Sequence, residues 1–211
     1  MDIQSFTVGP FAENTYLLTK DNKSVLIDPG FFDPNEFKTV KDELQKKDTE
    51  LIAVLLTHAH VDHVLGLEKV LKEFDLSVYL NHSDLYLWEN FPEQAKRFGF
   101  HAAGFDFTPE NLPEQKNFTL GPFGFDVLFT PGHSPDHVSL YFDKEGIVVA
   151  GDALFRESIG RTDLYKGSFE RLATSIKEKL YTLPDETTVY PGHGPSTTIG
   201  HEKAANSFVK G

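Results

Sequence analysis

Apolar and polar positions along the chain predict a mixture of strands and helices. Residues 3–8, 14–20 and 24–28 are short runs rich in β-branched and aromatic residues, and turn residues separate them, which is typical of strands. Leu51 to Leu56 is a continuous apolar run and predicts a buried strand. Further strands are predicted at 77–80, 118–120, 123–130, 138–142, 146–150 and 187–190.

Helical spacing of apolar residues marks the segments between these strands. A helix is predicted at 34–46, after Asp33 as its N-cap, and another at 168–181, where apolar residues recur on one stripe. Shorter helices are predicted at 65–74, 83–90, 92–98 and from residue 200 onward, and residues 99–116 are predicted as loop. The α/β class follows, and the order of elements is compatible with two similar halves, each a sheet with helices outside.

Composition narrows the class of protein. The chain has 211 residues without a linker or a break in composition, so a single domain over residues 1–211 is expected. Its 32 acidic and 20 basic residues give a formal net charge of −12, which argues against nucleic-acid binding. No apolar run is long enough for a membrane span. The N-terminal residues lack signal-peptide features, so a cytoplasmic protein is expected, with its oligomeric state left open.

Cysteine and histidine counts limit the chemistry. The chain has no cysteine, which excludes disulfides, a cysteine nucleophile and thiolate metal ligands. It has nine histidines, so a transition-metal site must be built from imidazole and carboxylate groups.

The strongest signal is the segment Thr57-His58-Ala59-His60-Val61-Asp62-His63, which directly follows the apolar strand 51–56. At the end of a strand, His58 and His60 point to one side because side chains alternate. Asp62 and His63 lie at the turn into the next helix and can reach the same place. Four potential ligands within six residues would be strained around one ion, but they can serve two ions.

Three more candidate ligands follow later strands. They are His133 in Thr130-Pro131-Gly132-His133, Asp152 in Gly151-Asp152, and His193 in Pro191-Gly192-His193-Gly194. Ligand sites in α/β proteins favour the carboxyl ends of strands. Five histidines and two aspartates therefore become available, which gives two ions four ligands each if Asp152 is shared. His137 is a candidate for support of the site, and His82, His101 and His201 have no assigned role.

The motif from Thr57 to His63 resembles the signature of the metallo-β-lactamase superfamily. The segments around His133, Asp152 and His193 resemble its later motifs in the same order, and Leu26-Ile27-Asp28-Pro29-Gly30 resembles its first motif. Within the superfamily, Ser158 to Leu164 and Gly192 to Gly200 are similar to the small glyoxalase II-like hydrolases. The implied fold is a four-layer αββα sandwich with two mixed sheets and flanking helices.

The resemblance also implies roles for individual residues. His58, His60 and His133 would bind one metal ion, Asp62, His63 and His193 would bind the other, and Asp152 would bridge them. Asp28 would support the site, so Asp62 and Asp28 are the predicted catalytic carboxylates. The expected cofactors are two divalent ions, most simply Zn²⁺, although the ligand types also suit iron and manganese.

The implied reaction is metal-dependent hydrolysis of a thioester such as S-lactoylglutathione. Two ions can hold a water between them and lower its pKa to about 7, and a thiolate leaves without much help from a general acid. Arg161 is the candidate anchor for a substrate carboxylate, with Tyr165 and Lys166 as weaker candidates.

Alternatives within the resemblance remain open. The chain carries no counterpart of the C-terminal helical region with which glyoxalase II binds glutathione, so another thiol carrier is possible. An iron-dependent sulfur dioxygenase shares the fold and the Gly-Arg-Thr-Asp segment and would use His58, His133 and Asp152. Lactone or phosphodiester hydrolysis and a metal-holding binding module are further options, and β-lactam hydrolysis is weakly expected without an export signal.

Overall fold

The computed structural model describes residues 1–211, which form two compact units. The first unit comprises residues 1–112 and 120–123, and the second comprises residues 113–119 and 124–211. The assignment of the whole chain to one domain remains a prediction. No helix has the length and apolar character needed to cross a membrane.

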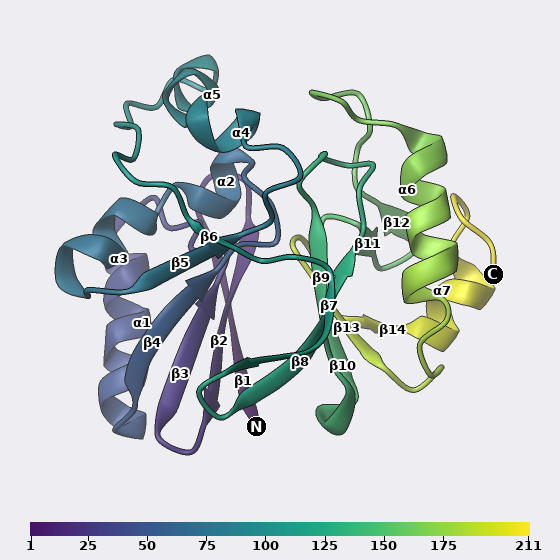
Figure 1. Ribbon diagram of the computed structural model, residues 1–211, viewed down its shortest axis with the longest axis horizontal. Helices are drawn as coiled ribbons and strands as arrows, with labels where there is room; N and C mark the ends of the chain where they lie inside the picture. The colour runs from purple at the N-terminus through teal and green to yellow at the C-terminus, as the bar shows by residue number, and fades with distance from the viewer. The chain divides into compact units, whose positions relative to one another are not determined.

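The first unit contains a six-stranded mixed sheet in the order β1-β2-β3-β4-β5-β6 (Figure 1). Its first three strands pair antiparallel, and β3 to β6 run parallel. The register places Ile27 of β3 opposite Leu55 of β4, so the residues after these two strands emerge at the same edge. The strands are β1 (Asp2–Val8), β2 (Glu13–Lys20), β3 (Lys23–Ile27), β4 (Glu50–Leu55), β5 (Ser77–Leu80) and β6 (Glu110–Asn111).

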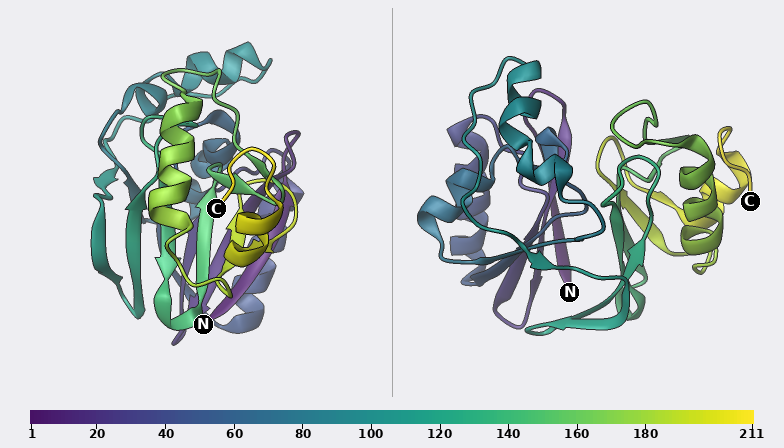
Figure 2. Two further views of the ribbon diagram at one scale, coloured as in Figure 1. Left: turned by 90° about the vertical axis from the view of Figure 1, so that its right-hand side faces the viewer. Right: turned by 45° about the horizontal axis from the view of Figure 1, so that its top comes forward.

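Helices α1 (Pro34–Lys47) and α3 (Leu67–Glu73) cover one face of this sheet (Figures 1 and 2). Asp33 is the N-cap of α1, as predicted, and forms a capping box with Glu36. Three short helices lie after β4 and β5: α2 (Val61–Val64), α4 (Tyr86–Glu89) and α5 (Phe91–Arg97). The core of the unit lies between the sheet and the helices, where β3 and β4 are almost completely buried.

The second unit contains another six-stranded mixed sheet, in the order β14-β13-β10-β9-β8-β7. Strands β10 and β13 are parallel, and β10, β9 and β8 pair antiparallel. The strands are β7 (Gln115–Leu120), β8 (Phe123–Phe129), β9 (Val138–Phe142), β10 (Ile147–Gly151), β13 (Thr188–Pro191) and β14 (Thr197–Thr198). A separate hairpin joins β11 (Leu154–Phe155) to β12 (Ser158–Ile159).

Helices α6 (Phe169–Ser175) and α7 (Ile199–Ala205) pack on one face of the second sheet (Figures 1 and 2). Leu172, Ile176 and Leu180 are fully buried with Val148 and Val189 of the sheet, as the apolar stripe predicted. A 3₁₀ turn at Asp143–Glu145 connects β9 to β10.

The sequence pattern missed several short elements. The predicted loop 99–116 contains β6 and the start of β7, and the hairpin β11–β12 and strand β14 were not predicted. Two-residue strands are too short to show a hydrophobic period, and only their pairing with another strand defines them. The predicted helix 168–181 becomes α6 followed by a π-helical segment at Ile176–Leu180.

Candidate metal centre

The first unit carries four predicted ligands in one short stretch after β4. This strand ends at Leu55, so His58 and His60 lie in a loop beyond it rather than in the strand, while Asp62 and His63 lie in α2. The side chains of His58 and His63 are fully buried, and Asp62 is partly exposed. The ring of His58 lies 4.7 Å from that of His60 and 4.1 Å from that of His63, measured between centroids, so the predicted cluster forms.

Asp28 supports this cluster from the end of the neighbouring strand. It is buried with φ of 50°, and its backbone N–H donates to Leu55 O at 3.1 Å. Its Oδ1 accepts the backbone N–H of Thr57 at 2.7 Å, and its Oδ2 accepts the Thr57 hydroxyl at 2.6 Å and Nδ1 of His63 at 3.0 Å. The carboxylate therefore holds both ends of the ligand-bearing stretch.

Hydrogen-bond direction sets the tautomers of two of the predicted ligand histidines. The hydroxyl hydrogen of Thr57 goes to Asp28, so Nδ1 of His58, 3.0 Å from Thr57 Oγ1, must be the donor in that contact. Nδ1 of His63 likewise donates to the Asp28 carboxylate. Each neutral ring then has its lone pair on Nε2, which is the form that binds a metal ion.

Glu13 is a second buried carboxyl beside His63, and sequence reasoning did not single it out. Its Oε2 lies 2.9 Å from Thr15 Oγ1, and its Oε1 lies 3.9 Å from Nδ1 of His63. Complete burial raises the pKa of the Glu13 carboxyl well above its usual range, against the lowering effect of His63. Glu13 can be identified as a neighbour of His63 only from the fold, which brings it next to the Asp28 motif.

Backbone packing fixes the same stretch from two further sides. A Cβ at Gly30 would lie 2.3 Å from the backbone oxygen of Asp62, so only glycine allows this approach. On α5, the Gln94 amide donates to Ala59 O at 3.0 Å and to Leu87 O at 2.6 Å. Gln94 therefore ties the backbone between His58 and His60 to α4 and α5, a role that no sequence motif indicated.

In the second unit, His133 lies in the loop between β8 and β9. A Cβ at Gly132, which has φ of 135°, would lie 2.2 Å from Leu172 N, so the loop packs directly on α6. The Ser175 hydroxyl of α6 donates to Pro131 O at 2.7 Å. Nδ1 of His133 donates to the backbone oxygen of Arg161 at 2.8 Å, which again places the lone pair on Nε2.

Asp152 and His193 follow the parallel strands β10 and β13. The Gly192 N–H donates to Gly151 O at 2.8 Å, which fixes the two loops beside each other. Oδ2 of Asp152 lies 3.4 Å from Nε2 of His133 and 3.6 Å from Nε2 of His193. Two ligand atoms on one tetrahedral ion with bonds of about 2.0–2.1 Å lie roughly 3.4 Å apart, so these separations fit a carboxylate that shares a metal ion with each imidazole.

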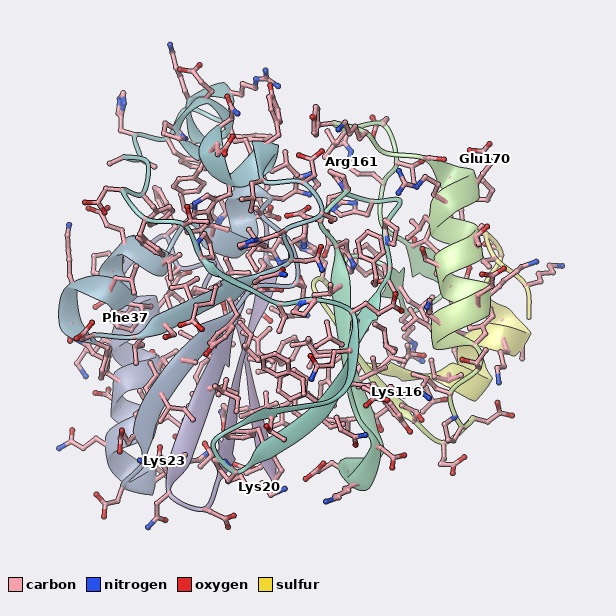
Figure 3. The ribbon with its side chains drawn as sticks, viewed as in Figure 1. Lys20, Lys23, Phe37, Lys116, Arg161 and Glu170 are labelled. Atoms are coloured by element: carbon pink, nitrogen blue, oxygen red, sulfur yellow. The ribbon has the colours of Figure 1, made fainter.

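The predicted substrate contacts follow the β11–β12 hairpin. Arg161 is labelled in Figure 3. Its Nε and Nη2 donate to the two carboxylate oxygens of Asp163, each at 2.7 Å, and both side chains are exposed. The guanidinium lowers the pKa of Asp163 to about 2, and the carboxylate raises the pKa of Arg161. Nζ of Lys166 lies 5.3 Å above the ring centre of Tyr165.

The remaining histidines differ in burial and in contacts. His82 contacts Pro109 O through Nε2 at 2.8 Å, His201 contacts Glu157 Oε1 at 3.0 Å, and His101 is exposed. His137 is fully buried and contacts the backbone of Asp152.

Taken unit by unit, the donor sets fit divalent metal ions. Only imidazole nitrogens and carboxylate oxygens are offered, and His58, His63 and His133 present their lone pairs on Nε2. Such donors suit zinc, iron and manganese.

Comparison with known proteins agrees with a site for divalent metal ions. The family model described as the metallo-β-lactamase superfamily matches residues 8–193. A probable metallo-hydrolase of Streptococcus pyogenes is 42% identical over 201 residues, covering 93% of this chain and 85% of the relative. A hydroxyacylglutathione hydrolase of Haemophilus influenzae is 36% identical over 213 residues, covering 99% of this chain and 98% of the relative.

Solved structures match the whole chain. The BLEG-1 B3 metallo-β-lactamase has a TM-score of 0.88 at 37% identity and covers 100% of both chains. The protein TTHA1623, solved in a di-iron-bound form, has a TM-score of 0.87 at 40% identity, covering 98% of this chain and 100% of its own. The predicted α/β fold with two mixed sheets and flanking helices is confirmed.

Proposed function

Because the chain belongs to the metallo-β-lactamase superfamily and is a metal-dependent hydrolase, we propose that it cleaves a thioester of the S-(2-hydroxyacyl)glutathione type. The observation that carries this proposal is the similarity to a hydroxyacylglutathione hydrolase over nearly the full length of both chains. The absence of cysteine agrees with it, since a thiol nucleophile is excluded and a metal-activated water can serve as the attacking group.

The proposed centre uses all seven predicted ligands. His58, His60 and His133 would hold one ion, Asp62, His63 and His193 would hold the other, and Asp152 would contribute to both. Its position within 3.4 and 3.6 Å of two imidazole nitrogens supports the bridging role. When bound, the ions supply Lewis acidity and lower the pKa of water toward neutrality.

Other residues of the chain orient the proposed ligand histidines. Asp28 holds His63 and, through Thr57, His58 with their lone pairs on Nε2. The backbone oxygen of Arg161 does the same for His133. Since a thiolate is a good leaving group, the reaction needs no separate proton donor.

We assign Arg161 to the anionic end of the substrate. Its planar guanidinium can hold a carboxylate through two parallel hydrogen bonds, and it already does so with Asp163. Both side chains are exposed, so a substrate carboxylate can exchange with Asp163 at little cost. Tyr165 and Lys166 are further candidate contacts on the same segment.

The experiment combines metal analysis with a substrate panel on one sample. Metal-free protein is loaded with zinc, iron or manganese, its metal content is measured, and hydrolysis of S-lactoylglutathione is followed. Protein with two metal ions per chain should hydrolyse it at typical enzyme rates, on the order of 1–10³ per second. His58→Ala and Asp152→Ala should abolish activity, while His101→Ala serves as the matched histidine control.

Other substrates in the panel distinguish thioester hydrolysis from the alternative reactions. A β-lactam is included because the BLEG-1 structure is similar over the full chain, and oxygen uptake with glutathione persulfide tests an iron-dependent dioxygenase. A protein with two ions that is inert toward thioesters but turns over one of these would overturn the thioester assignment.

A further inference from the structure

His137 closes the loop that carries His133. The loop leaves β8 at Thr130 and enters β9 after His137, and the Thr130 N–H donates to His137 O at 3.0 Å. The two side chains also meet, since Thr130 Oγ1 lies 2.8 Å from Nδ1 of His137. Both residues are fully buried.

The other ring nitrogen reaches the loop after β10. The backbone N–H of Asp152 points at Nε2 of His137 across 3.0 Å. A backbone N–H can only donate, so Nε2 must carry the lone pair and accept. The one imidazole therefore connects the loops of two proposed metal ligands, His133 and Asp152.

A chain of hydroxyl groups leads independently to the same tautomer. The Ser139 hydroxyl lies 3.3 Å from Ala150 O, which can only accept, so the single hydrogen of Ser139 is used there. Thr130 Oγ1, 3.0 Å from Ser139 Oγ, must then donate to it. With its own hydrogen used, Thr130 can only accept from Nδ1 of His137.

The two ends of this network agree on one arrangement of hydrogens. Starting from Asp152, Nε2 is an acceptor, and starting from Ala150, Nδ1 is a donor. A network whose donors and acceptors all match has one hydrogen-bonded state, which gives it rigidity. The ring of His137 presents no nitrogen lone pair other than the one that Asp152 uses.

We propose that His137 is a positioning residue that sets the place of the Asp152 carboxylate relative to His133 by holding the Asp152 backbone. This inference rests on the proposed function, because it takes Asp152 and His133 as metal ligands. Asp152 Oδ2 lies within 3.6 Å of both His133 and His193, so a displacement of its backbone changes the ligand geometry at both imidazoles.

The test measures zinc affinity. His137→Phe keeps a ring of similar shape but removes both nitrogens, and His137→Gln offers an amide oxygen where Nε2 stands. Loss of a residue that supports metal ligands typically weakens metal affinity by about 10–100-fold. We expect such a loss for His137→Phe in competition with a chromophoric zinc chelator, and recovery of most of the affinity for His137→Gln.

A buried hydroxyl far from the ligands supplies the control. Ser24→Ala removes a buried hydroxyl that contacts Thr19 and Thr49 at the end of β3 opposite Asp28. It should lower stability without changing zinc affinity. Thr130→Val removes only the hydroxyl that receives Nδ1–H of His137 and should weaken zinc binding less than His137→Phe, so it serves if the larger change prevents folding.

A direct readout is available on the zinc-free wild-type protein. Nitrogen NMR of the imidazoles should show His137 with hydrogen on Nδ1 only. Zinc binding by a folded His137→Phe variant equal to that of the wild type, or a hydrogen on Nε2, would overturn the proposal. Wild-type protein that binds two zinc ions yet ignores thioesters would instead overturn only the proposed function.

Discussion

At the residue scale, the direction of hydrogen bonds decides which nitrogen of a histidine can bind a metal ion. His58 donates through Nδ1 to Thr57, His63 to Asp28, and His133 to the backbone of Arg161. A hydroxyl, a carboxylate and a carbonyl thus produce the same tautomer three times. His137 has the same tautomer but turns its lone pair toward a backbone N–H, which distinguishes it from the three proposed ligands.

Gly160 packs closely against two proposed ligands of the second unit, Asp152 and His133. A Cβ there would lie 1.9 Å from the backbone oxygen of Asp152 and 3.0 Å from Nδ1 of His133. Gly160→Ala should therefore cost about 1–3 kcal/mol in the free energy of unfolding and reduce metal content. Urea unfolding and metal analysis check both effects.

Gly124 is the matched control for that substitution, because a Cβ there meets nothing within 4 Å. Gly124→Ala should leave metal content unchanged. Equal metal content in both variants would show that Gly160 does not limit the ligand geometry.

The ion pair between Arg161 and Asp163 should make the stability of the folded chain depend on pH. The guanidinium lowers the pKa of Asp163 to about 2, below the value of about 3.9 for an unfolded chain. The pair therefore stabilises the folded chain above about pH 4, and the contribution is lost as pH falls through 4 toward 2. Both side chains are exposed, so the effect on stability is small.

Carbon NMR of the Asp163 carboxyl group provides the measurement. Its titration midpoint should lie near 2 in the wild type and move back toward the ordinary range in Arg161→Gln. A midpoint that ignores Arg161→Gln would mean that the pair does not persist in solution.

At the element scale, the proposed ligands lie where neighbouring strands end, and hydrogen bonds from other elements fix the loops that follow. Gln94 of α5 holds the stretch after β4, and Ser175 of α6 holds the loop after β8. Helix α7 has the corresponding role for the β11–β12 hairpin, which leads to Arg161. Hydrogen bonds from neighbouring elements can hold loop side chains in a defined position.

Glu202 shows how α7 is fastened. This fully buried carboxylate accepts the Thr197 hydroxyl at 2.6 Å, the Glu157 N–H at 2.9 Å and the Asn206 amide at 2.9 Å. Glu202→Gln replaces one acceptor by a donor, and hydrogen bonds to a charged group contribute about 1.5–3 kcal/mol. We expect a loss of that size in the free energy of unfolding, measured by urea titration.

The comparison variant is Glu178→Gln, at an exposed position of the π-helical segment. It should change the free energy of unfolding by less than about 0.5 kcal/mol. If the two variants were equally stable, the carboxylate of Glu202 would not fasten α7.

At the scale of the whole molecule, part of the formal net charge of −12 comes from acidic residues at the proposed metal centre. In the first unit, Asp28 and Asp62 lie at or next to proposed ligand positions, and Glu13 is buried beside Asp28 and His63. Acidic groups this close to each other are stabilised by bound cations. Metal binding should therefore contribute to the stability of the chain as well as to its activity.

Metal removal tests that expectation. An ion present at 100 times its Kd stabilises the folded state by about 2.7 kcal/mol, and for a chain of this size about 1 kcal/mol changes Tm by about 2–4 °C. Chelation should lower Tm by roughly 5–10 °C, and zinc should restore it. Asp152→Asn should remove most of the difference, whereas the same Tm with and without chelator would contradict metal-linked stability.

Sequence reasoning located the candidate ligands because they are adjacent in the chain or follow predicted strands. Leu51 to Leu56 is apolar enough to mark β4, and His58 to His63 follow it directly. The ligand types themselves identify metal chemistry. The tautomers of those histidines could not be predicted, because they depend on Thr57, Asp28 and the backbone of Arg161, which approach only in the folded chain.

The sequence by itself determined the class of fold, the position of the candidate ligands and the absence of thiol chemistry, because these depend on local pattern and composition. Only the tertiary structure decided the contacts of Glu13, Gln94 and His137, and the pairing of Arg161 with Asp163. Glu13 and Gln94 lie in ordinary-looking segments, and strand pairing and helix packing bring them to the ligands. Hydrogen-bond partners distant in sequence have no local signal, since their contact exists only after the sheets have formed.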